Sequence, residues 1–390
     1  MSVTAHTVCR VCGTPRLFRW LDLGTQPLAN AVRSADAPLR DEFRAPLAVA
    51  ACPDCKLSQL THVVAPTMLY ARYNFQAGIS AGWRAHCDAL AHTLGRAGAV
   101  VLDIASNDGT LLRAFAARGC TTLGVEPAQD FAGPGVRTAF WSSALARDPE
   151  IAGRVDVLTA TNVLGHVDDV HDFMAGVEIA LAPSGIAVIE VPYLGKLLDT
   201  LAFDTIYHEH LSYWSVTALK RLCSAHGLTL WNVIPQAIHG GSIRALIARE
   251  GTPSAAVTHY LVAEHHDFRR HMYQRASAHI TRRIADINEA LLDLEYVGFG
   301  ASAKAAVLLG TLDVRALPRA IYDETRAKQG HRMPGTQVPI LAPPLDWRME
   351  PRPLVIFAWN WARDLAPRFR AAGFTGPILV PQPTPRWLDE

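Results

Sequence analysis

The chain has 390 residues, of which 49% are hydrophobic and 19% are charged. This composition fits a globular protein with a large core and excludes a disordered or fibrous chain. Lys and Arg number 37 and Asp and Glu 36, so the charge gives no sign of a nucleic-acid or anionic-membrane partner.

The length predicts two to three domains. No apolar stretch reaches the roughly 18 residues that a membrane span needs, and the first ten residues lack the apolar core of a signal peptide. Seven cysteines are too few and too unevenly placed for a disulfide scaffold. We therefore expect a reduced, cytoplasmic protein without a membrane partner.

Two C-x-x-C pairs lie near the N-terminus, with an insertion between them that predicts a compact extended module rather than a helix. Four thiolates at this spacing can close a tetrahedral zinc shell with no open position, so the predicted metal role is structural. The alternative is four unrelated thiols, whereas the three remaining cysteines look like ordinary small apolar residues. The expected ligands are Cys9, Cys12, Cys52 and Cys55.

A pattern of strand, helix and strand begins near residue 98. Apolar runs predict strands at residues 100–104, 121–126, 155–161 and 185–191, with a helix at 111–118 after the first strand. Strands and helices that alternate in this way predict a doubly wound α/β sheet.

The turn after the first strand, residues 105–110, and Glu126 at the end of the second strand form an arrangement that holds an adenosine cofactor. The turn lacks the G-x-G-x-x-G that a pyrophosphate needs, so S-adenosylmethionine fits better than a dinucleotide. The alternative is an ordinary α/β turn beside a solvated Glu126.

Residues 255–292 predict helix with charged residues on one face, and a second strand–glycine–helix unit follows at 296–304. Further strands at 320–323, 354–359 and 377–380 predict a second, smaller α/β domain. Gly298 and Gly300, with Asp323 downstream, imitate a dinucleotide fingerprint. A nicotinamide-dependent sugar oxidoreductase is therefore the strongest alternative to an enzyme that uses S-adenosylmethionine. In place of a dinucleotide, Lys304 at the start of the following helix could bind a diphosphate.

Residues 204–214 contain the densest cluster of titratable and aromatic groups, including Tyr207, His208, Glu209 and His210. His and Glu can act as bases, and Tyr can polarise a carbonyl oxygen. Two alternatives stay open: each group is a satisfied polar side chain, or His208 and His210 bind a metal from one face of a strand. His166 ends another strand and could face the same pocket. Neighbouring residues of a regular strand point to opposite sides, so we expect irregular backbone where Tyr207, Glu209 and His210 face one pocket.

With these motifs in place, the whole chain resembles the sugar C-methyltransferases of deoxysugar biosynthesis, which act on nucleotide-linked 4-keto sugars. The resemblance rests on the two cysteine pairs and on segments 21–24, 27–30, 104–111, 124–127, 162–166, 203–213, 239–244, 328–330 and 334–336. It implies a zinc-binding module (1–70), a Rossmann-like methyltransferase domain that binds S-adenosylmethionine (71–235), and a smaller Rossmann-like substrate-binding domain (236–390).

The resemblance also implies a role for individual residues. Methylation of the carbon next to the keto group, expected at carbon 3, would pass through an enolate generated by a base. The expected catalytic residues are His210 as the base, with Glu209, Tyr207 and His166. The expected cofactor contacts are Asp103, Ala105, Ser106, Asn107, Gly109, Glu126, Pro127 and Asn162, and the expected substrate contacts are His239, Arg244, Lys304 and Lys328.

Two segments depart from the family pattern, at Tyr70–Tyr73 and directly after Lys304, and both lie where substrate contacts are expected. They leave the sugar and its carrier nucleotide open. The expected partner is a nucleotide-linked keto sugar, and the expected assembly is a monomer or homodimer. A zinc-ribbon RNA methyltransferase is a further alternative, which the near-zero charge and the lack of a basic run disfavour.

Overall fold

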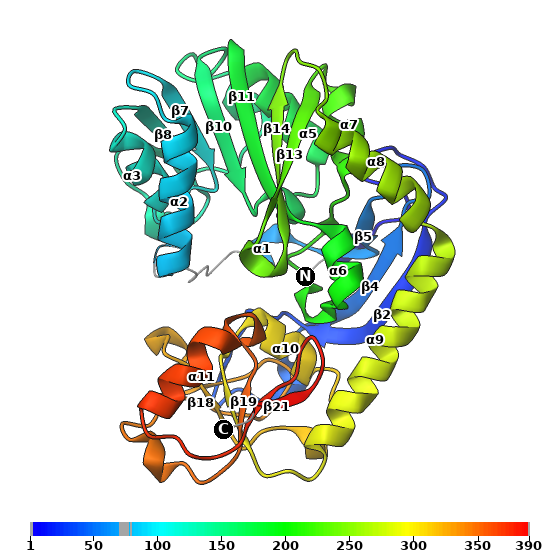
Figure 1. The fold of residues 1–390 in the computed structure, drawn as a ribbon, viewed down its shortest axis with the longest axis vertical. Coiled ribbons are helices and arrows are strands. Elements are labelled where there is room, and N and C mark those ends of the chain that lie inside the picture. The colour runs from blue at the N-terminus through cyan, green and yellow to red at the C-terminus, as the bar shows by residue number, and fades with distance from the viewer. Residues whose placement is uncertain (1–2, 70–77, 79, 389–390) are drawn as a thin grey trace.

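A computed structural model describes residues 3–69, 78 and 80–388. Figure 1 shows two α/β domains, one above the other, with the N-terminal strands beside and between them. Helix α9 (Arg270–Leu291) runs along one side of the molecule from the upper domain to the lower one.

The N-terminal module is extended, as the sequence predicts, and its strands pair antiparallel. Its main sheet has the order β12-β5-β4-β2, and two short strand pairs flank it. The fourth strand, β12, comes from the methyltransferase part of the chain, directly after the Tyr-His-Glu-His segment. Strand β3 pairs with β17 of the C-terminal domain. The bounds are β1 Val3–Ala5, β2 Phe18–Pro27, β3 Arg33–Ser34, β4 Arg44–Ala51, β5 Ser58–Leu60, β6 His62–Val64, β12 Ser212–Tyr213 and β17 His331–Arg332.

The middle domain is a doubly wound sheet of the order β13-β14-β11-β10-β7-β8-β9 in which only β14 runs antiparallel to its neighbours. The predicted strands at 100–104 and 155–161 form over those same residues. The bounds are β7 Val100–Ile104, β8 Thr121–Val125, β9 Val136–Arg137, β10 Val155–Thr161, β11 Leu181–Pro192, β13 Thr229–Gln236 and β14 Ser242–Ala248.

Helices cover both faces of this sheet because successive strand residues point to opposite sides. On β7, Val101 packs with helices α2 and α3, whereas Leu102 packs with α5, α7 and α8 on the other face. The helices are α1 Pro66–Leu69, α2 Ala81–Leu94, α3 Thr110–Ala116, α4 Ser143–Ala146, α5 Val170–Ala180, α6 Leu194–Thr200, α7 Val216–Ala225 and α8 Ala255–Asp267.

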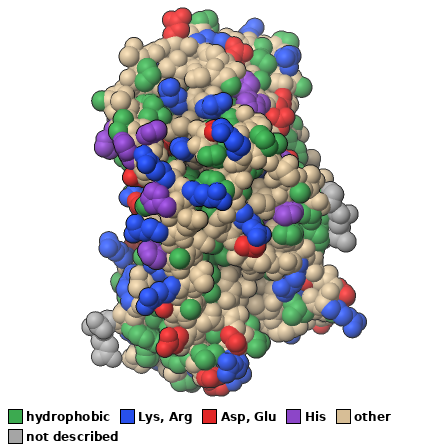
Figure 2. Space-filling model, turned by 90° about the vertical axis from the view of Figure 1, so that its right-hand side faces the viewer, with side chains coloured by type: hydrophobic (Ala, Val, Ile, Leu, Met, Phe, Trp, Pro, Cys, Tyr) green, Lys and Arg blue, Asp and Glu red, His purple; other side chains and the backbone are tan. Residues whose placement is uncertain are grey.

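The predicted helical region 255–292 forms α8 and α9. The buried face of α9 carries Tyr273, Ile280 and Ile287, while Arg275 and Arg282 lie on its exposed face. Lys, Arg and His side chains are spread down this side of the molecule (Figure 2). The near-neutral total charge therefore hides a locally basic surface.

The C-terminal domain has a second Rossmann-like sheet of the order β18-β16-β15-β19-β20-β21, which is parallel except for β21. Helix α10 (Ala303–Leu309) follows β15 through the glycine loop, and α11 (Ala362–Ala371) follows β19. The strands are β15 Val297–Phe299, β16 Ile321–Tyr322, β18 Ile340–Leu341, β19 Leu354–Ile356, β20 Ile378–Val380 and β21 Arg386–Leu388. No helix of the described residues is both long and apolar enough to traverse a lipid bilayer.

Candidate active site

The Tyr-His-Glu-His segment has irregular backbone, as the alternation of side chains in a regular strand required. A 3-10 turn, η5 (Phe203–Thr205), precedes it, and β12 follows it. The His210 amide donates to the Tyr207 carbonyl over 2.9 Å, which closes a tight turn. This turn leaves Tyr207 and His210 partly exposed while His208 and Glu209 are buried.

His210 is held by its own chain on one side. Its Nδ1 lies 2.7 Å from the carbonyl oxygen of Thr205. Since a carbonyl can only accept, Nδ1 carries the proton and Nε2 of the neutral ring becomes the acceptor. The rings of Tyr207 and His166 lie 3.9 and 4.9 Å from the His210 ring, measured between centroids. The arrangement presents a basic nitrogen beside two potential donors.

His166 comes from a different element, the short turn η4 (Leu164–His166) that follows β10. Burial lowers the pKa of His166 to about 4, against the effect of backbone hydrogen bonds with Glu209 and Asn162. The imidazole is therefore neutral at physiological pH. A neutral imidazole can donate a hydrogen bond without carrying a charge into the site.

Glu209 points toward the N-terminal module. Its Oε1 accepts a hydrogen bond of 2.9 Å from Nδ2 of Asn30, while Oε2 is buried without a hydrogen-bond partner. Burial raises the pKa of Glu209, and Asn30 works against that rise. Sequence reasoning treated Asn30 only as part of the zinc module. The one sequence feature that could have identified Asn30 is its polar amide at the end of the otherwise apolar segment Pro27–Asn30.

His208 lies apart from this group. Its side chain is buried, and Nε2 lies 3.2 Å from the Ala45 carbonyl in the N-terminal sheet. The alternative of a metal held by His208 and His210 from one strand face is wrong, because the backbone there is not a strand. Within the described residues, the four cysteines are the one group of three or more side chains placed to bind a metal.

The predicted cofactor turn has unusual backbone. Ala105 and Asn107 adopt the left-handed conformation with φ of 58° and 48°, and Gly109 has φ of 74°. Asn162, after the neighbouring strand β10, also has φ of 58°. Such conformations cost about 1–3 kcal/mol each in residues other than glycine, and they concentrate at ligand sites. Both strained segments lie at the carboxyl ends of adjacent parallel strands, where α/β sheets bind ligands.

Glu126 organises the same turn. One of its oxygens accepts a hydrogen bond of 2.8 Å from the Asn107 amide, and the other accepts one of 2.8 Å from the Ala128 amide. Pro127 is the residue between Glu126 and Ala128. A carboxylate offers about four acceptor positions, so lone pairs remain for ribose hydroxyls. Asp103 instead points into the sheet, where Thr159 donates to it over 2.7 Å and burial raises the pKa of Asp103 to about 7.

Two buried polar atoms at this end of the sheet have no partner. They are Oγ of Ser106 and Oδ1 of Asn162. A buried polar atom without a partner is destabilising, which is resolved when a ligand supplies the missing hydrogen bond. The methionyl and adenosine groups of S-adenosylmethionine carry both donors and acceptors. The turn, Glu126 and these two atoms therefore fit that cofactor.

The four expected substrate contacts are placed as follows. Arg244 Nε lies 2.5 Å from Glu190 on β11, and the other Glu190 oxygen lies 2.8 Å from His86. Lys328 donates over 2.8 Å to the Ala301 carbonyl in the glycine loop. Lys304 lies 4.7 Å above the ring centre of Trp359. Tyr70–Tyr73 and the side chain of His239 lie outside what the structure describes.

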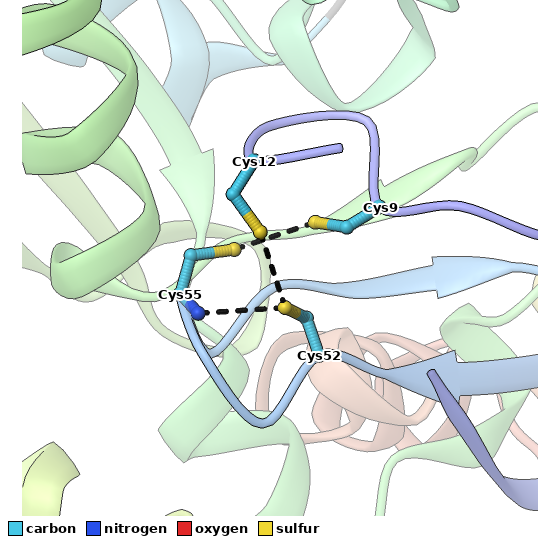
Figure 3. A group of neighbouring side chains, drawn as sticks. All are labelled: Cys9, Cys12, Cys52 and Cys55. Carbon is cyan, nitrogen blue, oxygen red and sulfur yellow. Dashed lines mark hydrogen bonds between the residues drawn. The ribbon is translucent and has the colours of Figure 1, made fainter. Parts of the chain in front are cut away.

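The two cysteine pairs form matching turns, at residues 9–14 and 52–57. In each turn the amide four residues after the first cysteine bonds back to that cysteine's carbonyl, over 2.8 and 3.1 Å. Both turns need positive φ directly after the second cysteine, supplied by Gly13 at 69° and Lys56 at 65°. Figure 3 shows the four side chains pointing toward one another from these turns.

The sulfur cluster fits zinc. Its ligand atoms all lie within 4.8 Å of one another. Hydrogen bonds from Cys55 and Cys9 lower the pKa of the Cys52 thiol. Their hydrogen bonds to Cys52 in turn raise the pKa values of the Cys9 and Cys55 thiols. Four sulfurs this close therefore cannot all ionise unless a cation balances them. Zn²⁺ supplies that charge and takes four thiolates in a tetrahedron.

The two cysteine turns also contact the methyltransferase domain. Ser215, the N-cap of α7, donates to the Cys55 carbonyl over 3.4 Å, and His171 on α5 lies 3.0 Å from the Val11 carbonyl. Together with the pairing of β12 and β5, these contacts show that the module packs directly against the middle domain. The cysteines thus stabilise the segment that carries Glu209 and His210.

Comparison with known proteins gives three consecutive family matches. A zinc-binding domain matches residues 9–70, a methyltransferase domain matches 75–233, and a C-methyltransferase C-terminal domain matches 237–383. The C-methyltransferase NovU of Streptomyces niveus is 32% identical over 407 aligned residues, which cover 98% of this chain and 96% of that protein.

Solved structures give weaker likenesses. A geranyl diphosphate C-methyltransferase from Streptomyces coelicolor has a TM-score of 0.33 and 15% identity, covering 43% of this chain and 80% of its own. A TehB-like methyltransferase from Corynebacterium glutamicum has a TM-score of 0.33 and 17% identity, with coverages of 47% and 93%.

The nicotinamide-dependent oxidoreductase interpretation is not supported. The glycine loop on which it depended lies within the match to a C-methyltransferase C-terminal domain. In the structure, Asp323 accepts the Ala301 and Thr325 amides over 2.7 and 2.8 Å and so shapes that loop. The position of Asp323 directly after β16 is thus accounted for by the shape of the glycine loop, without a dinucleotide.

Proposed function

Because the chain belongs to the S-adenosylmethionine-dependent C-methyltransferases with an N-terminal zinc-binding domain, we propose that it methylates the carbon next to the keto group of a nucleotide-linked 4-keto-deoxysugar. The observation that carries the proposal is the bond of 2.7 Å between His210 Nδ1 and the Thr205 carbonyl. It sets the tautomer that a base needs. The sugar substrate is supported by the resemblance of the sequence to enzymes of deoxysugar biosynthesis.

The chemistry starts with removal of a proton. A carbon beside a ketone becomes acidic only when the resulting enolate oxygen is stabilised and a base is close to the carbon. In the proposed reaction His210 Nε2 takes that proton, so the imidazole becomes an imidazolium. The Thr205 carbonyl then faces the Nδ1 proton of the cation and stabilises it.

The enolate oxygen needs hydrogen-bond donors. The proposed donors are the hydroxyl of Tyr207 and the neutral ring of His166, both of which lie against His210. Because the pKa of His166 is lowered to about 4, this ring keeps one donor and one acceptor nitrogen during the reaction. It therefore does not compete with His210 as the base.

When bound, S-adenosylmethionine supplies a methyl group that its sulfonium makes electrophilic. The residues proposed to hold it are Glu126 for the ribose, Asn162 and Ser106 for polar atoms, and the turn that contains Asn107 and Gly109. The hydrogen bond between the His166 side chain and the Asn162 backbone connects this end of the sheet to the ring that lies against His210. Positioning of two reactants in this way can supply roughly 7–11 kcal/mol in favourable cases.

The proposed role of Glu209 is to bind a sugar hydroxyl. Its Oε2 is buried without a partner, and its Oε1 is fixed by Asn30. A hydroxyl donated to Oε2 would satisfy that atom and orient the sugar ring over His210. Arg244 and Lys328 are proposed to act on the substrate through the segments they support, since both are already engaged with Glu190 and Ala301.

A panel of nucleotide-linked 4-keto sugars, incubated with the zinc-loaded protein and S-adenosylmethionine, tests the proposal. The product of one member should gain the mass of one methylene, and NMR should place the new methyl on the carbon beside the ketone. Transfer to oxygen or nitrogen, or acceptance only of substrates without a ketone, would contradict it.

A further inference from the structure

The turn that holds His210 lies at the contact between the two α/β domains. Within η5, Asp204 is 1% exposed, and its Oδ2 accepts a hydrogen bond of 2.6 Å from the indole Nε1 of Trp359. Trp359 opens the turn η10 (Trp359–Trp361) that follows β19 in the C-terminal domain. One side-chain hydrogen bond thus links the sheet of the C-terminal domain to the catalytic segment.

A partly buried lysine also contacts this indole ring. The Lys304 ammonium lies 4.7 Å over the Trp359 ring, at the start of α10. Burial lowers the pKa of Lys304, and the charge of Asp204 opposes that change. Burial raises the pKa of Asp204, and the Lys304 charge and the indole N–H both oppose that rise by favouring the carboxylate. The attraction between a cation and an indole face also helps to hold the Trp359 ring in place beside Asp204.

Asp204 and the residue that fixes His210 are neighbours. Thr205, the last residue of η5, presents the carbonyl to which His210 Nδ1 donates. The turn has three residues, so a movement of Asp204 also moves the Thr205 carbonyl. The contact from Trp359 to Asp204 therefore has a direct structural consequence for the His210 ring.

We propose that Trp359, Asp204 and Lys304 act as positioning residues through which the C-terminal domain fixes the tautomer and orientation of His210. The proposal rests on the proposed function of His210 as the base. It gives the C-terminal domain a part in the chemical step in addition to substrate binding. It also gives Lys304 a role that does not require contact with a diphosphate.

Selective ¹⁵N labelling of histidine in the full-length, zinc-loaded protein with bound S-adenosylhomocysteine gives the test. The His210 signals are assigned as those lost in His210→Gln. Wild type should show Nδ1 protonated and Nε2 unprotonated for the neutral ring. In Trp359→Phe, which keeps the aromatic face under Lys304 but removes the N–H, the His210 signals should shift toward a mixture of both tautomers.

Trp361→Phe is the matched control, because Trp361 belongs to the same turn and is 44% exposed. It should leave the His210 signals at their wild-type positions. Asp204→Asn is the second variant, since it keeps the shape of the side chain and removes the charge, and it should also mix the tautomers. On a sugar nucleotide that is turned over, Trp359→Phe should lower kcat at least tenfold with little change in KM, and Trp361→Phe should not.

Unchanged His210 tautomers in both Trp359→Phe and Asp204→Asn would overturn the positioning proposal. A wild-type ring protonated on Nε2 instead of Nδ1 would also overturn it, even if neither variant folded. The proposed function fails separately, if no nucleotide-linked keto sugar is methylated. In that case the NMR comparison still decides whether the C-terminal domain positions His210.

Discussion

Nδ2 of Asn30 lies 2.9 Å from Oε1 of Glu209, although 179 residues separate them in the sequence. This bond joins the zinc-binding module to the Tyr-His-Glu-His segment. The module therefore provides the hydrogen-bond partner of Glu209, the buried carboxylate that we propose binds a sugar hydroxyl. The same module also supports the segment through the pairing of β5 with β12.

Replacing Asn30 tests this connection. Asn30→Ala leaves Glu209 Oε1 buried without its donor, which typically costs about 1–3 kcal/mol. We expect turnover to fall about tenfold, the rate equivalent of about 1.4 kcal/mol, with unchanged affinity for S-adenosylmethionine. Asn360→Ala, at an exposed asparagine, is the control and should behave as wild type. Equal turnover in the two variants would show that Glu209 does not depend on Asn30.

Zinc should be needed for the fold of the N-terminal module. Purified protein is expected to contain one zinc per chain, and Cys52→Ser should lower both zinc content and thermal stability. Cys120→Ser is the matched control, because Cys120 is a buried cysteine outside the cluster. The four-cysteine site would be ruled out if the purified protein held no zinc and all four thiols reacted freely.

Glu126 should contribute to cofactor affinity. Glu126→Ala removes a charged acceptor, so binding of S-adenosylmethionine should weaken by roughly 1.5–3 kcal/mol in calorimetry. The variant should also lose thermal stability without cofactor, because the amides of Asn107 and Ala128 lose their acceptor. Asp130→Asn, at a nearby exposed carboxylate, should change neither quantity. Unaltered affinity of Glu126→Ala would exclude the ribose contact.

The neutral state of His166 predicts a pH dependence of stability. The pKa of His166 is lowered from 6.5 to about 4 in the folded chain, so between these values the unfolded chain binds more protons. Stability from this residue is therefore fully present above pH 6.5 and is lost as the pH falls. Between about pH 7.5 and 5.5, wild type should lose about 1.3 kcal/mol more than His166→Gln.

The difference between the two proteins is the diagnostic quantity. Burial raises the pKa of Asp103 to about 7, so this group changes stability in the opposite direction over the same range. Its contribution is common to both proteins and cancels in the comparison. Chemical denaturation at several pH values provides the measurement. Parallel curves for wild type and His166→Gln would contradict this prediction, because they would mean that the pKa of His166 is the same in the folded and unfolded chains.

Local patterns in the sequence predicted much of the fold. The strand at residues 155–161 forms over those residues, because an apolar run of that length is buried on both faces of a parallel sheet. The cysteine cluster was equally predictable, since each C-x-x-C turn is fixed by neighbours within six residues. The irregular backbone at Tyr207–His210 followed from the number of polar groups that had to share one pocket.

Contacts between distant segments were not predictable. Nothing local in residues 27–30 shows that Asn30 faces Glu209, and nothing at Trp359 shows that its indole donates to Asp204, 155 residues earlier. His86 and Glu190 were missed for the same reason, although they occupy the Arg244 guanidinium that was expected to face substrate. Such pairs depend on how distant elements pack within and between the domains, which the spacing of residues along the chain does not encode.

The most direct test of the base assignment is hydrogen exchange without a methyl donor. In deuterated water, wild-type protein should exchange the proton beside the keto group of a bound 4-keto sugar nucleotide. His210→Asn should retain wild-type affinity for S-adenosylmethionine and exchange that proton about a hundredfold more slowly or worse, the range for loss of a general base. Exchange by His210→Asn at the wild-type rate would contradict the account and assign the proton transfer to another residue.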